Sequence, residues 1–324
     1  MTNSAPPARI PVIDVAPLLN RDPHGERSVA KQIGDACRGI GFFYITGHGV
    51  TPNELGAVFG KAAEFFTGDA SVKLQSAFTG AGGNRGYIRL GEETLDPGKP
   101  PDVKEAFNIG LDLAPDDPDL LAKKPFRALN LWPDVPGFRP TMLAYFTHMW
   151  NLGRILHRAF ALDLGIEPTF FDDKFEKPMA TLRLLHYPPV EKPLDEGQLG
   201  AGEHTDYGNV TLLATDSSGG LMVRDRSGTW LDAPVIPNAY VCNIGDCLMR
   251  WTNDEYVSTP HRVQSPAVER YSIAFFLDPN PDAMVDPSLA RPHQSPRYAP
   301  ISVRDYLMSR LTATYNHHDK VANV

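Results

Sequence analysis

The second half of the sequence is a series of short β-rich runs separated by turn signals, and this series limits the fold more than any other feature. The turns beyond Thr181 are marked by SSGG, DRSG, IGD and TNDE. Strands of this length and frequency predict an antiparallel sandwich or jelly roll. The predicted strands are Thr181–Tyr187, Val210–Thr215, Leu221–Arg224, Tyr240–Ile244, Cys247–Trp251, His261–Val263 and Tyr271–Leu277.

Helical periodicity dominates the part of the chain before these strands. Apolar residues recur at helical spacing in Ser28 to Ile40, Pro52 to Phe66 and Arg139 to Leu164, and residues 41–46 read as a buried strand between the first two. Residues 67–137 are rich in Gly, Pro and Asp and are expected to form a surface connection. A last helix is predicted for residues 303–315, with Ser302 and Asp305 as its start signal.

These elements predict an α+β protein with a jelly-roll core, a double-stranded β-helix, and flanking helices. The expected division of the chain follows the change from helical periodicity to short strand-like runs. We expect residues 1–137 to form an N-terminal helical and loop region. Residues 138–324 should contain the long helix, the jelly-roll core and the C-terminal helix.

Composition narrows the classes of partner. The formal net charge is −8, and no Lys/Arg run is long enough to act as a basic arm, so we expect no nucleic-acid partner. No apolar run approaches the roughly 18 residues that span a bilayer, and the N-terminus lacks the pattern of a signal peptide. A cytoplasmic protein without membrane contact is therefore expected. The three cysteines, Cys37, Cys242 and Cys247, are expected to be core thiols. The oligomeric state is not indicated.

Two histidines and one aspartate have the spacing of a metal site. His204 and Asp206 in GEHTDYG are two residues apart, so in an extended segment both side chains leave the same face. His261 in STPHR follows several strands later, which lets a jelly roll fold it back onto the pair. Two imidazoles and one carboxylate on one face, with open positions, are typical of non-haem iron(II) oxygenases. These three ligands alone do not distinguish an iron(II) enzyme from a zinc enzyme.

A second pattern favours iron with an acidic co-substrate. Arg270 and Ser272 lie two residues apart on a predicted strand and point the same way. A guanidinium offers two parallel N–H donors to a carboxylate, the hydroxyl adds a third hydrogen bond, and a dicarboxylic acid could then reach the metal with its other end. Tyr187 in LRLLHYPP is a candidate for a further hydrogen bond to the same carboxylate.

Separated motifs then resemble one known family. HTD at 204–206, STPHRV at 258–263 and RYS at 270–272 are similar to the isopenicillin N synthase-like family of 2-oxoglutarate- and iron(II)-dependent dioxygenases. IPVIDVAPLL, GFFYITGHGV at 41–50 and the stretch at 243–263 extend the resemblance over nearly the whole chain.

The resemblance implies iron(II) at His204, Asp206 and His261, and 2-oxoglutarate held by Arg270, Ser272 and Tyr187. It implies oxidation of a small organic substrate by O2, most commonly hydroxylation, with release of succinate and CO2. No catalytic residue beyond the metal centre is expected.

The substrate has to be inferred from the loop-rich part of the chain. The segments Asn84–Tyr87 and Lys104–Asn108 are expected near the mouth of the site, and Tyr87 and Phe107 are the candidate substrate contacts.

Three other readings remain. The first is an iron oxidase of the same fold that does not use 2-oxoglutarate. The second is a cupin-like zinc protein that binds or isomerises a ligand. The third is a metal-free binding module, although two buried imidazoles beside a carboxylate would be costly to retain without a metal.

Overall fold

The computed structural model describes residues 10–78, 84–189 and 195–310. Its largest unit is an eight-stranded sheet, antiparallel except for the pair formed by its first two strands. In spatial order its strands are β1 (Val12–Asp14), β2 (Phe42–Thr46), β10 (Tyr240–Ile244), β7 (Val210–Thr215), β12 (Arg270–Leu277), β5 (Thr181–Tyr187), β4 (Glu105–Gly110) and β3 (Gly86–Ile88). Strands from both sides of residue 137 share this sheet, and the division of the chain at that point stays a prediction.

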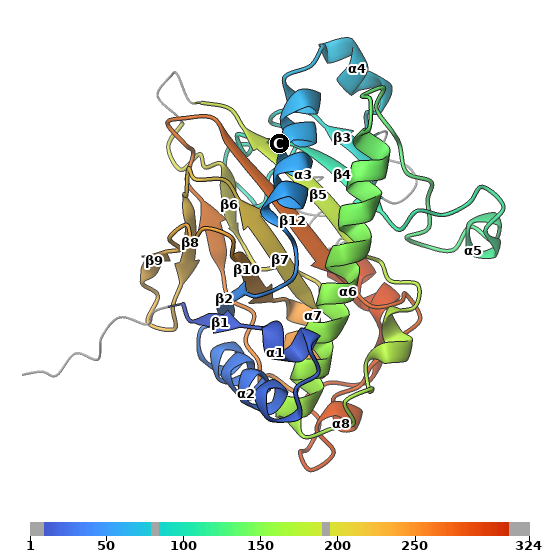
Figure 1. The fold of residues 1–324 in the computed structure, drawn as a ribbon, viewed down its shortest axis with the longest axis vertical. Helices are drawn as coiled ribbons and strands as arrows, with labels where there is room; N and C mark the ends of the chain where they lie inside the picture. Colours follow the sequence, from blue (N-terminus) through green and yellow to red (C-terminus); the bar gives the residue numbers. More distant parts are fainter. Residues whose placement is uncertain (1–9, 79–83, 190–194, 311–324) are drawn as a thin grey trace, which may run out of the picture.

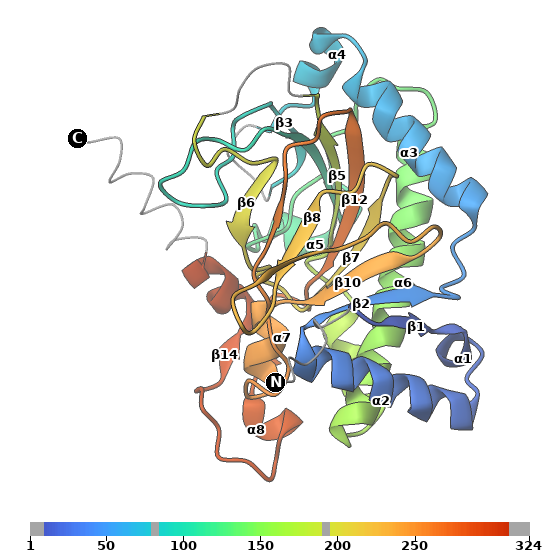
Figure 2. The same ribbon diagram turned by 90° about the vertical axis from the view of Figure 1, so that its left-hand side faces the viewer.

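A smaller sheet lies against one face of the large one. Its strands are β6 (Ala201–His204), β11 (His261–Val263), β8 (Leu221–Arg224) and β9 (Trp230–Asp232), in that order. Figure 2 shows β6 and β8 on one side of the large sheet, with α3 and α6 on the other side. The two facing sheets form the predicted double-stranded β-helix. A separate pair is formed by β13 (Met284–Val285) and β14 (Ile301–Ser302).

Helices cover the opposite face of the large sheet, and the longest, α6, runs along it (Figure 1). Asp22 caps α2 and Thr51 caps α3, each accepting a hydrogen bond from a backbone N–H of the first turn. The helices are α1 (Ala16–Leu19), α2 (Pro23–Gly39), α3 (Pro52–Phe66), α4 (Ala70–Gln75), α5 (Pro118–Leu121), α6 (Phe138–Leu164), α7 (Asp246–Trp251) and α8 (Pro287–Ala290), with a 3-10 turn at Asp172–Phe175.

Strand alternation gives the large sheet two different faces. On β5, Leu182 and Leu184 point toward the helices and join the main hydrophobic core. Arg183, Leu185 and Tyr187 alternate with them and point toward the small sheet. The helix-covered face is therefore a packing surface, and the interior between the sheets is available for chemistry.

Most predicted elements are present, with two corrections. Cys247–Trp251 was predicted as a strand but belongs to α7, in which the buried Cys247, Leu248 and Trp251 have helical spacing. The region 67–137 was predicted as a surface connection, yet it supplies β3 and β4. All six residues of β4 are buried, so this strand lacks the alternation that reveals a half-exposed strand.

At the C-terminal end, residues 303–310 are helical, and the hydroxyl of Ser302 accepts a hydrogen bond from the N–H of Asp305 at 3.0 Å, as its start signal predicted. The remainder of the helix predicted for 303–315 lies outside the described residues.

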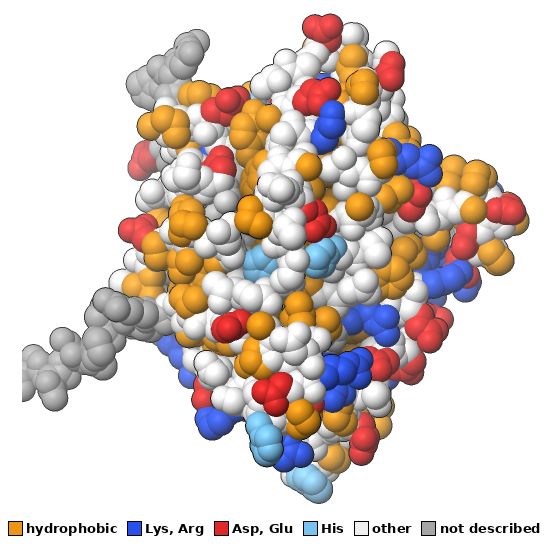
Figure 3. All heavy atoms as spheres, viewed as in Figure 1, with side chains coloured by type: hydrophobic (Ala, Val, Ile, Leu, Met, Phe, Trp, Pro, Cys, Tyr) orange, Lys and Arg blue, Asp and Glu red, His pale blue; other side chains and the backbone are white. Residues whose placement is uncertain are grey.

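The three cysteines are buried free thiols. Among the described residues, no helix has the length and apolarity needed to cross a membrane. On the face shown in Figure 3, basic and acidic side chains are interspersed.

The buried His157 on α6 should make stability depend on pH. A backbone carbonyl only accepts, so Nδ1 carries the proton and donates to the oxygen of Gly153 at 2.8 Å, which leaves Nε2 to accept from Asn209 at 3.2 Å. Burial lowers the pKa of His157 to about 4. The unfolded chain therefore binds more protons than the folded chain between about pH 6.5 and 4. The contribution of this residue is complete above that window and is lost as the pH falls through it.

From pH 7 to pH 5 we expect His157 to reduce the free energy of unfolding by about 2 kcal/mol. Urea denaturation of the wild type and of His157→Gln at both pH values measures this contribution. Equal pH slopes for the two proteins would show that His157 is not the responsible group.

A buried carboxylate joins three parts of the helical layer. Asp163 at the end of α6 receives hydrogen bonds from Arg38 of α2, at 3.2 and 2.5 Å, and from the Tyr256 hydroxyl at 2.7 Å. Asp163→Ala leaves Arg38 and Tyr256 without this partner, so we expect a loss of about 3 kcal/mol in the free energy of unfolding. Lys31→Ala, which breaks only an exposed pair with Asp35, should cost less than about 0.5 kcal/mol in the same denaturation experiment. Similar losses in both variants would contradict this role.

Candidate active site

The three predicted metal ligands come together between the two sheets. His204 ends β6 and His261 begins β11, and these two residues are direct partners in the antiparallel ladder. Asp206 lies in the turn after β6. Its Oδ1 is 3.8 Å from Nε2 of His204 and 3.7 Å from Nε2 of His261. One ligand atom from each residue lies within 4.8 Å of the others.

Hydrogen bonds orient both imidazoles. Nδ1 of His204 donates to the carbonyl of Gly202 at 2.8 Å, and Nδ1 of His261 donates to the carbonyl of Thr259 at 3.1 Å. A carbonyl cannot donate, so each Nδ1 holds a proton, and each Nε2 is left facing the common centre. Burial and the nearby His261 lower the pKa of His204, which keeps that imidazole neutral. Neutral imidazoles with free Nε2 atoms are suited to bind a metal.

The Asp206 carboxylate is fixed from the large sheet. Its Oδ2 accepts from the Thr211 hydroxyl at 2.5 Å and from the Asn243 amide at 2.7 Å. Burial alone would raise its pKa, yet these hydrogen bonds favour the ionised carboxylate, and the pKa of Asp206 lies below its usual value. With Oδ2 satisfied, Oδ1 remains as the ionised ligand atom.

The donor set fits an iron(II) ion that leaves positions open. Metal–ligand bonds of about 2.1 Å at right angles place neighbouring ligand atoms about 3 Å apart, so the observed spacing needs only small side-chain movements. Two neutral nitrogens and one carboxylate oxygen on one side leave the other side for a co-substrate and O2. Phe42 packs edge-on against His261, with ring centroids 5.3 Å apart, and limits access of water from that direction.

Arg270 and Ser272 lie on β12, on the large-sheet face that looks into the same interior. Arg270 is completely buried. Its Nε donates to the Gly219 carbonyl at 2.7 Å and its Nη1 to the Ser272 hydroxyl at 3.3 Å. The Tyr187 ring lies 4.5 Å from the guanidinium carbon, because Tyr187 is the cross-strand partner of Arg270. The structure thus brings together the three residues predicted to hold the acid.

One atom of this group indicates what it binds. Nη2 of Arg270 is buried and has no hydrogen-bond partner among the described residues, and no described carboxylate forms an ion pair with this guanidinium. A buried cation without an anion is costly. The carboxylate of a bound organic acid would supply the missing charge and accept the free N–H.

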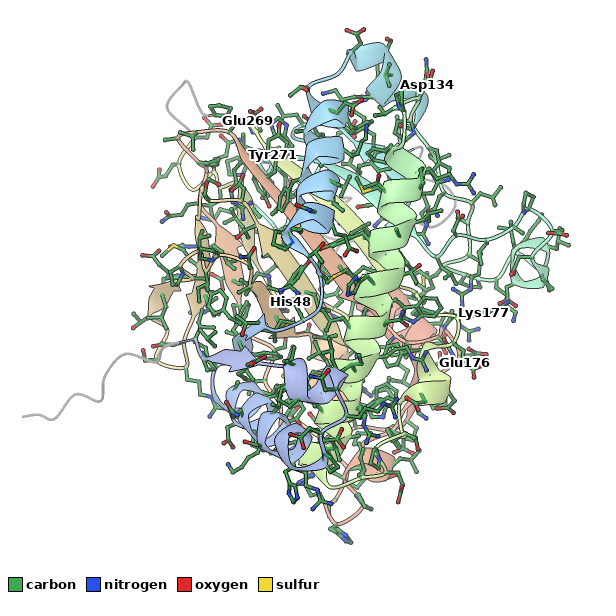
Figure 4. All side chains as sticks on the ribbon, viewed as in Figure 1. His48, Asp134, Glu176, Lys177, Glu269 and Tyr271 are labelled. Atoms are coloured by element: carbon green, nitrogen blue, oxygen red, sulfur yellow. The ribbon has the colours of Figure 1, made fainter. Side chains whose placement is uncertain are left out.

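On the opposite face, His186 holds the two strand ends in place. Its Nε2 lies 3.1 Å from Glu269, and its ring stacks on Tyr271 at 4.8 Å and 16°. Figure 4 shows Glu269 and Tyr271 together at the end of β12 beside α3. Because Glu269 and Tyr271 flank Arg270 in the sequence, this contact steadies the strand that carries the guanidinium.

Two other predicted residues lie elsewhere. Tyr87 on β3 donates its hydroxyl to Glu105, and the completely buried Phe107 on β4 packs against Phe65 and Phe138. Both side chains belong to the helix-covered core, on the far face of the sheet from His204. Their placement argues against the predicted contact with substrate.

Thr211 and Asn243 were not singled out in the sequence. Both lie on predicted strands. The alternation of side chains along a strand separates its two faces but does not show which face points toward Asp206. Their role depends on the register, in which Asn243 and Thr211 are direct partners and lie beneath Asp206.

Two family models match the chain. The N-terminal model of non-haem dioxygenases, described from morphine synthesis, matches residues 10–135. The model of the 2OG-Fe(II) oxygenase superfamily matches residues 178–279, the part that contains His204, Asp206, His261 and Arg270.

Curated proteins are similar in sequence to this chain over almost its full length. The 2-oxoglutarate-Fe(II) type oxidoreductase hxnY of Emericella nidulans is 36% identical, covering 95% of this chain and 91% of that protein. The 2-oxoglutarate-dependent dioxygenase citB of Monascus ruber is also 36% identical, covering 95% and 96%.

Solved structures show the same similarity. A Neurospora crassa protein crystallised with alpha-KG and thymine has a TM-score of 0.84 at 34% identity, covering 94% of this chain and 97% of that one. A putative 2OG-Fe(II) oxygenase family protein from Caulobacter crescentus has a TM-score of 0.83 at 30% identity, covering 95% and 99%. This chain therefore belongs to the family of 2-oxoglutarate- and iron(II)-dependent dioxygenases, enzymes that use iron(II), 2-oxoglutarate and O2.

Proposed function

We propose that His204, Asp206 and His261 hold the iron(II) and that Arg270, Ser272 and Tyr187 hold the distal carboxylate of 2-oxoglutarate. The observation that carries this assignment is the buried guanidinium of Arg270, which lacks an anion and faces the same interior as the metal ligands. A carboxylate there would receive two charge-assisted hydrogen bonds and the Ser272 hydroxyl. The keto-acid end would then lie toward the metal ligands.

The residues of the protein bind and orient the metal and the co-substrate, and they exclude water from the site. When bound, iron(II) with 2-oxoglutarate and O2 supplies the oxidising power to replace a C–H bond by C–OH, with release of succinate and CO2. The carbonyls of Gly202 and Thr259 keep the imidazole protons on Nδ1. Thr211 and Asn243 keep one carboxylate oxygen of Asp206 directed toward the metal position.

The substrate is proposed to be a small organic molecule that is hydroxylated. Support comes from the enclosed position of the site between two sheets and from the thymine in the similar Neurospora crassa structure. We further propose a cytoplasmic enzyme that binds neither nucleic acid nor membrane, in line with the net charge of −8.

Removal of the Arg270 guanidinium should abolish 2-oxoglutarate binding without removing the metal site. We expect Arg270→Ala to weaken 2-oxoglutarate binding at least 100-fold, because at least two charge-assisted hydrogen bonds are lost. The measurement is anaerobic titration of the iron(II) protein with 2-oxoglutarate, followed by the visible charge-transfer band.

The matched control is Arg262→Ala, since Arg262 lies beside the metal ligand His261 but packs on the Trp230 ring at 4.0 Å. This variant should keep the band. A band of wild-type strength in Arg270→Ala would refute the carboxylate assignment.

Loss of the hydrogen bonds to Asp206 should weaken iron binding. We expect Asn243→Leu and Thr211→Val each to lower the affinity for iron(II) by about 10- to 100-fold, because the carboxylate loses its fixed orientation. Equilibrium dialysis of iron(II) without 2-oxoglutarate measures the effect. Thr215→Val, on the same face of β7 but without a hydrogen bond to Asp206, should retain wild-type affinity. Unchanged affinity in the first two variants would show that these contacts are dispensable.

A further inference from the structure

Four charged side chains, two of them buried and two partly exposed, form a cluster next to the proposed metal site. Nζ of Lys104 lies 2.5 Å from Asp102 and 3.5 Å from Glu93, and Glu93 also accepts from the guanidinium of Arg183. Lys104 and Asp102 are almost completely buried, and the Arg183 side chain is 14% exposed. The cluster joins the loop before β4 to strand β5.

The cluster touches the strand that carries His204. Oδ1 of Asp102 accepts from the N–H of Gly202 at 2.8 Å, and the carbonyl of the same Gly202 receives Nδ1 of His204. Arg183 is the cross-strand partner of Ala274, two residues from Ser272 on the same face of the sheet. Arg183 therefore faces the interior that holds the metal ligands and Arg270.

Asn108 adds an unused acceptor beside Arg183. These two residues are direct partners in the β4–β5 ladder, so their side chains are neighbours on one face. Nδ2 of Asn108 donates to Asn84 at 2.7 Å. Asn108 is completely buried, and its Oδ1 has no hydrogen-bond partner among the described residues. A guanidinium donor and a free amide acceptor thus stand side by side.

Stability alone does not account for this cluster. Buried ion pairs are on average no more stabilising than apolar residues of similar volume, and an unpaired buried acceptor costs free energy. A ligand that needs both groups would give the arrangement a function.

The charges of the cluster indicate a neutral ligand. Glu93 and Asp102 balance Arg183 and Lys104, so these four side chains carry no net charge. The contact with Glu93 occupies one nitrogen of Arg183, and the guanidinium carries five N–H donors in total.

We propose that Arg183 and Asn108 form a substrate subsite for a neutral molecule that carries an amide or imide group. The substrate carbonyl accepts from Arg183, its N–H donates to Oδ1 of Asn108, and Glu93 sets the charge of the subsite. This subsite rests on the proposed function, since it selects the molecule to be oxidised.

The test uses the full chain loaded with iron(II) and 2-oxoglutarate, with thymine as a neutral imide probe and indole-3-acetate as a carboxylate probe. Probe binding is followed by its shift of the visible band, and turnover by succinate release. Wild type should bind thymine more tightly than indole-3-acetate. Arg183→Gln should raise the KM for thymine by about tenfold or more, with the band of the iron(II)–2-oxoglutarate form unchanged.

Glu93→Gln should reverse the preference, because removal of one negative charge leaves Arg183 free to pair with a carboxylate. Indole-3-acetate binding should then improve about tenfold. The matched control is Arg224→Gln, which removes an arginine paired at 2.7 Å with Glu203, next to His204 in sequence. This control should bind both probes as wild type does.

The outcomes separate the two proposals. Absence of the band in wild type overturns the proposed function itself. A normal band with no thymine binding, with indole-3-acetate preferred, or with a thymine KM that Arg183→Gln leaves unchanged, overturns only the subsite. If Arg183→Gln does not fold, the nearly isosteric Glu93→Gln decides by the ratio of the two probe affinities.

Discussion

The buried carboxylate of Asp206 is the interaction on which the arrangement of the two sheets depends. One of its oxygens faces the imidazoles of the small sheet, and the other is held by Thr211 and Asn243 of the large sheet. A buried carboxylate is stable only if it is hydrogen-bonded and compensated by charge. The sheets are thus joined through a polar centre that is most fully satisfied when a cation is bound there, which couples folding of the interior to metal binding.

The two faces of the large sheet divide structural and chemical roles. The face under α6 buries aromatic and aliphatic side chains, Tyr87 and Phe107 among them. The other face carries Thr211, Arg183, Ser272 and Arg270, whose polar groups bind Asp206, Glu93, the Gly219 carbonyl and, for Arg270 and Ser272, each other. Because a strand alternates its side chains, each strand of the centre serves both roles at once. A one-residue slip in register would exchange them, so the hydrophobic face fixes the positions of the polar groups.

Local sequence pattern was sufficient for most of the fold and for the principal residues of the candidate site. His204, Asp206, His261, Arg270 and Ser272 were identifiable because each pair lies two residues apart or follows a recognisable strand. Thr211, Asn243, Asn108 and Arg183 acquire their roles only from cross-strand register, which short-range spacing does not specify. The same limit explains the placement of Tyr87 and Phe107, since β3 and β4 are buried on both faces and give no alternation from which to choose a side. Cys247–Trp251 was too short a run to distinguish a helix from a strand.

The proposed metal ligands His204 and His261 belong to the small sheet, whereas Arg270 belongs to the large sheet. Packed sheets lie about 10 Å apart, a spacing that their side chains keep nearly constant. A molecule that contacts both the metal and Arg270 has to span that distance, so the spacing between the sheets sets the length that the acid must have. Under the proposed assignment, a shorter diacid would reach only one of these two ends, so the distance between the sheets would select the co-substrate by its length.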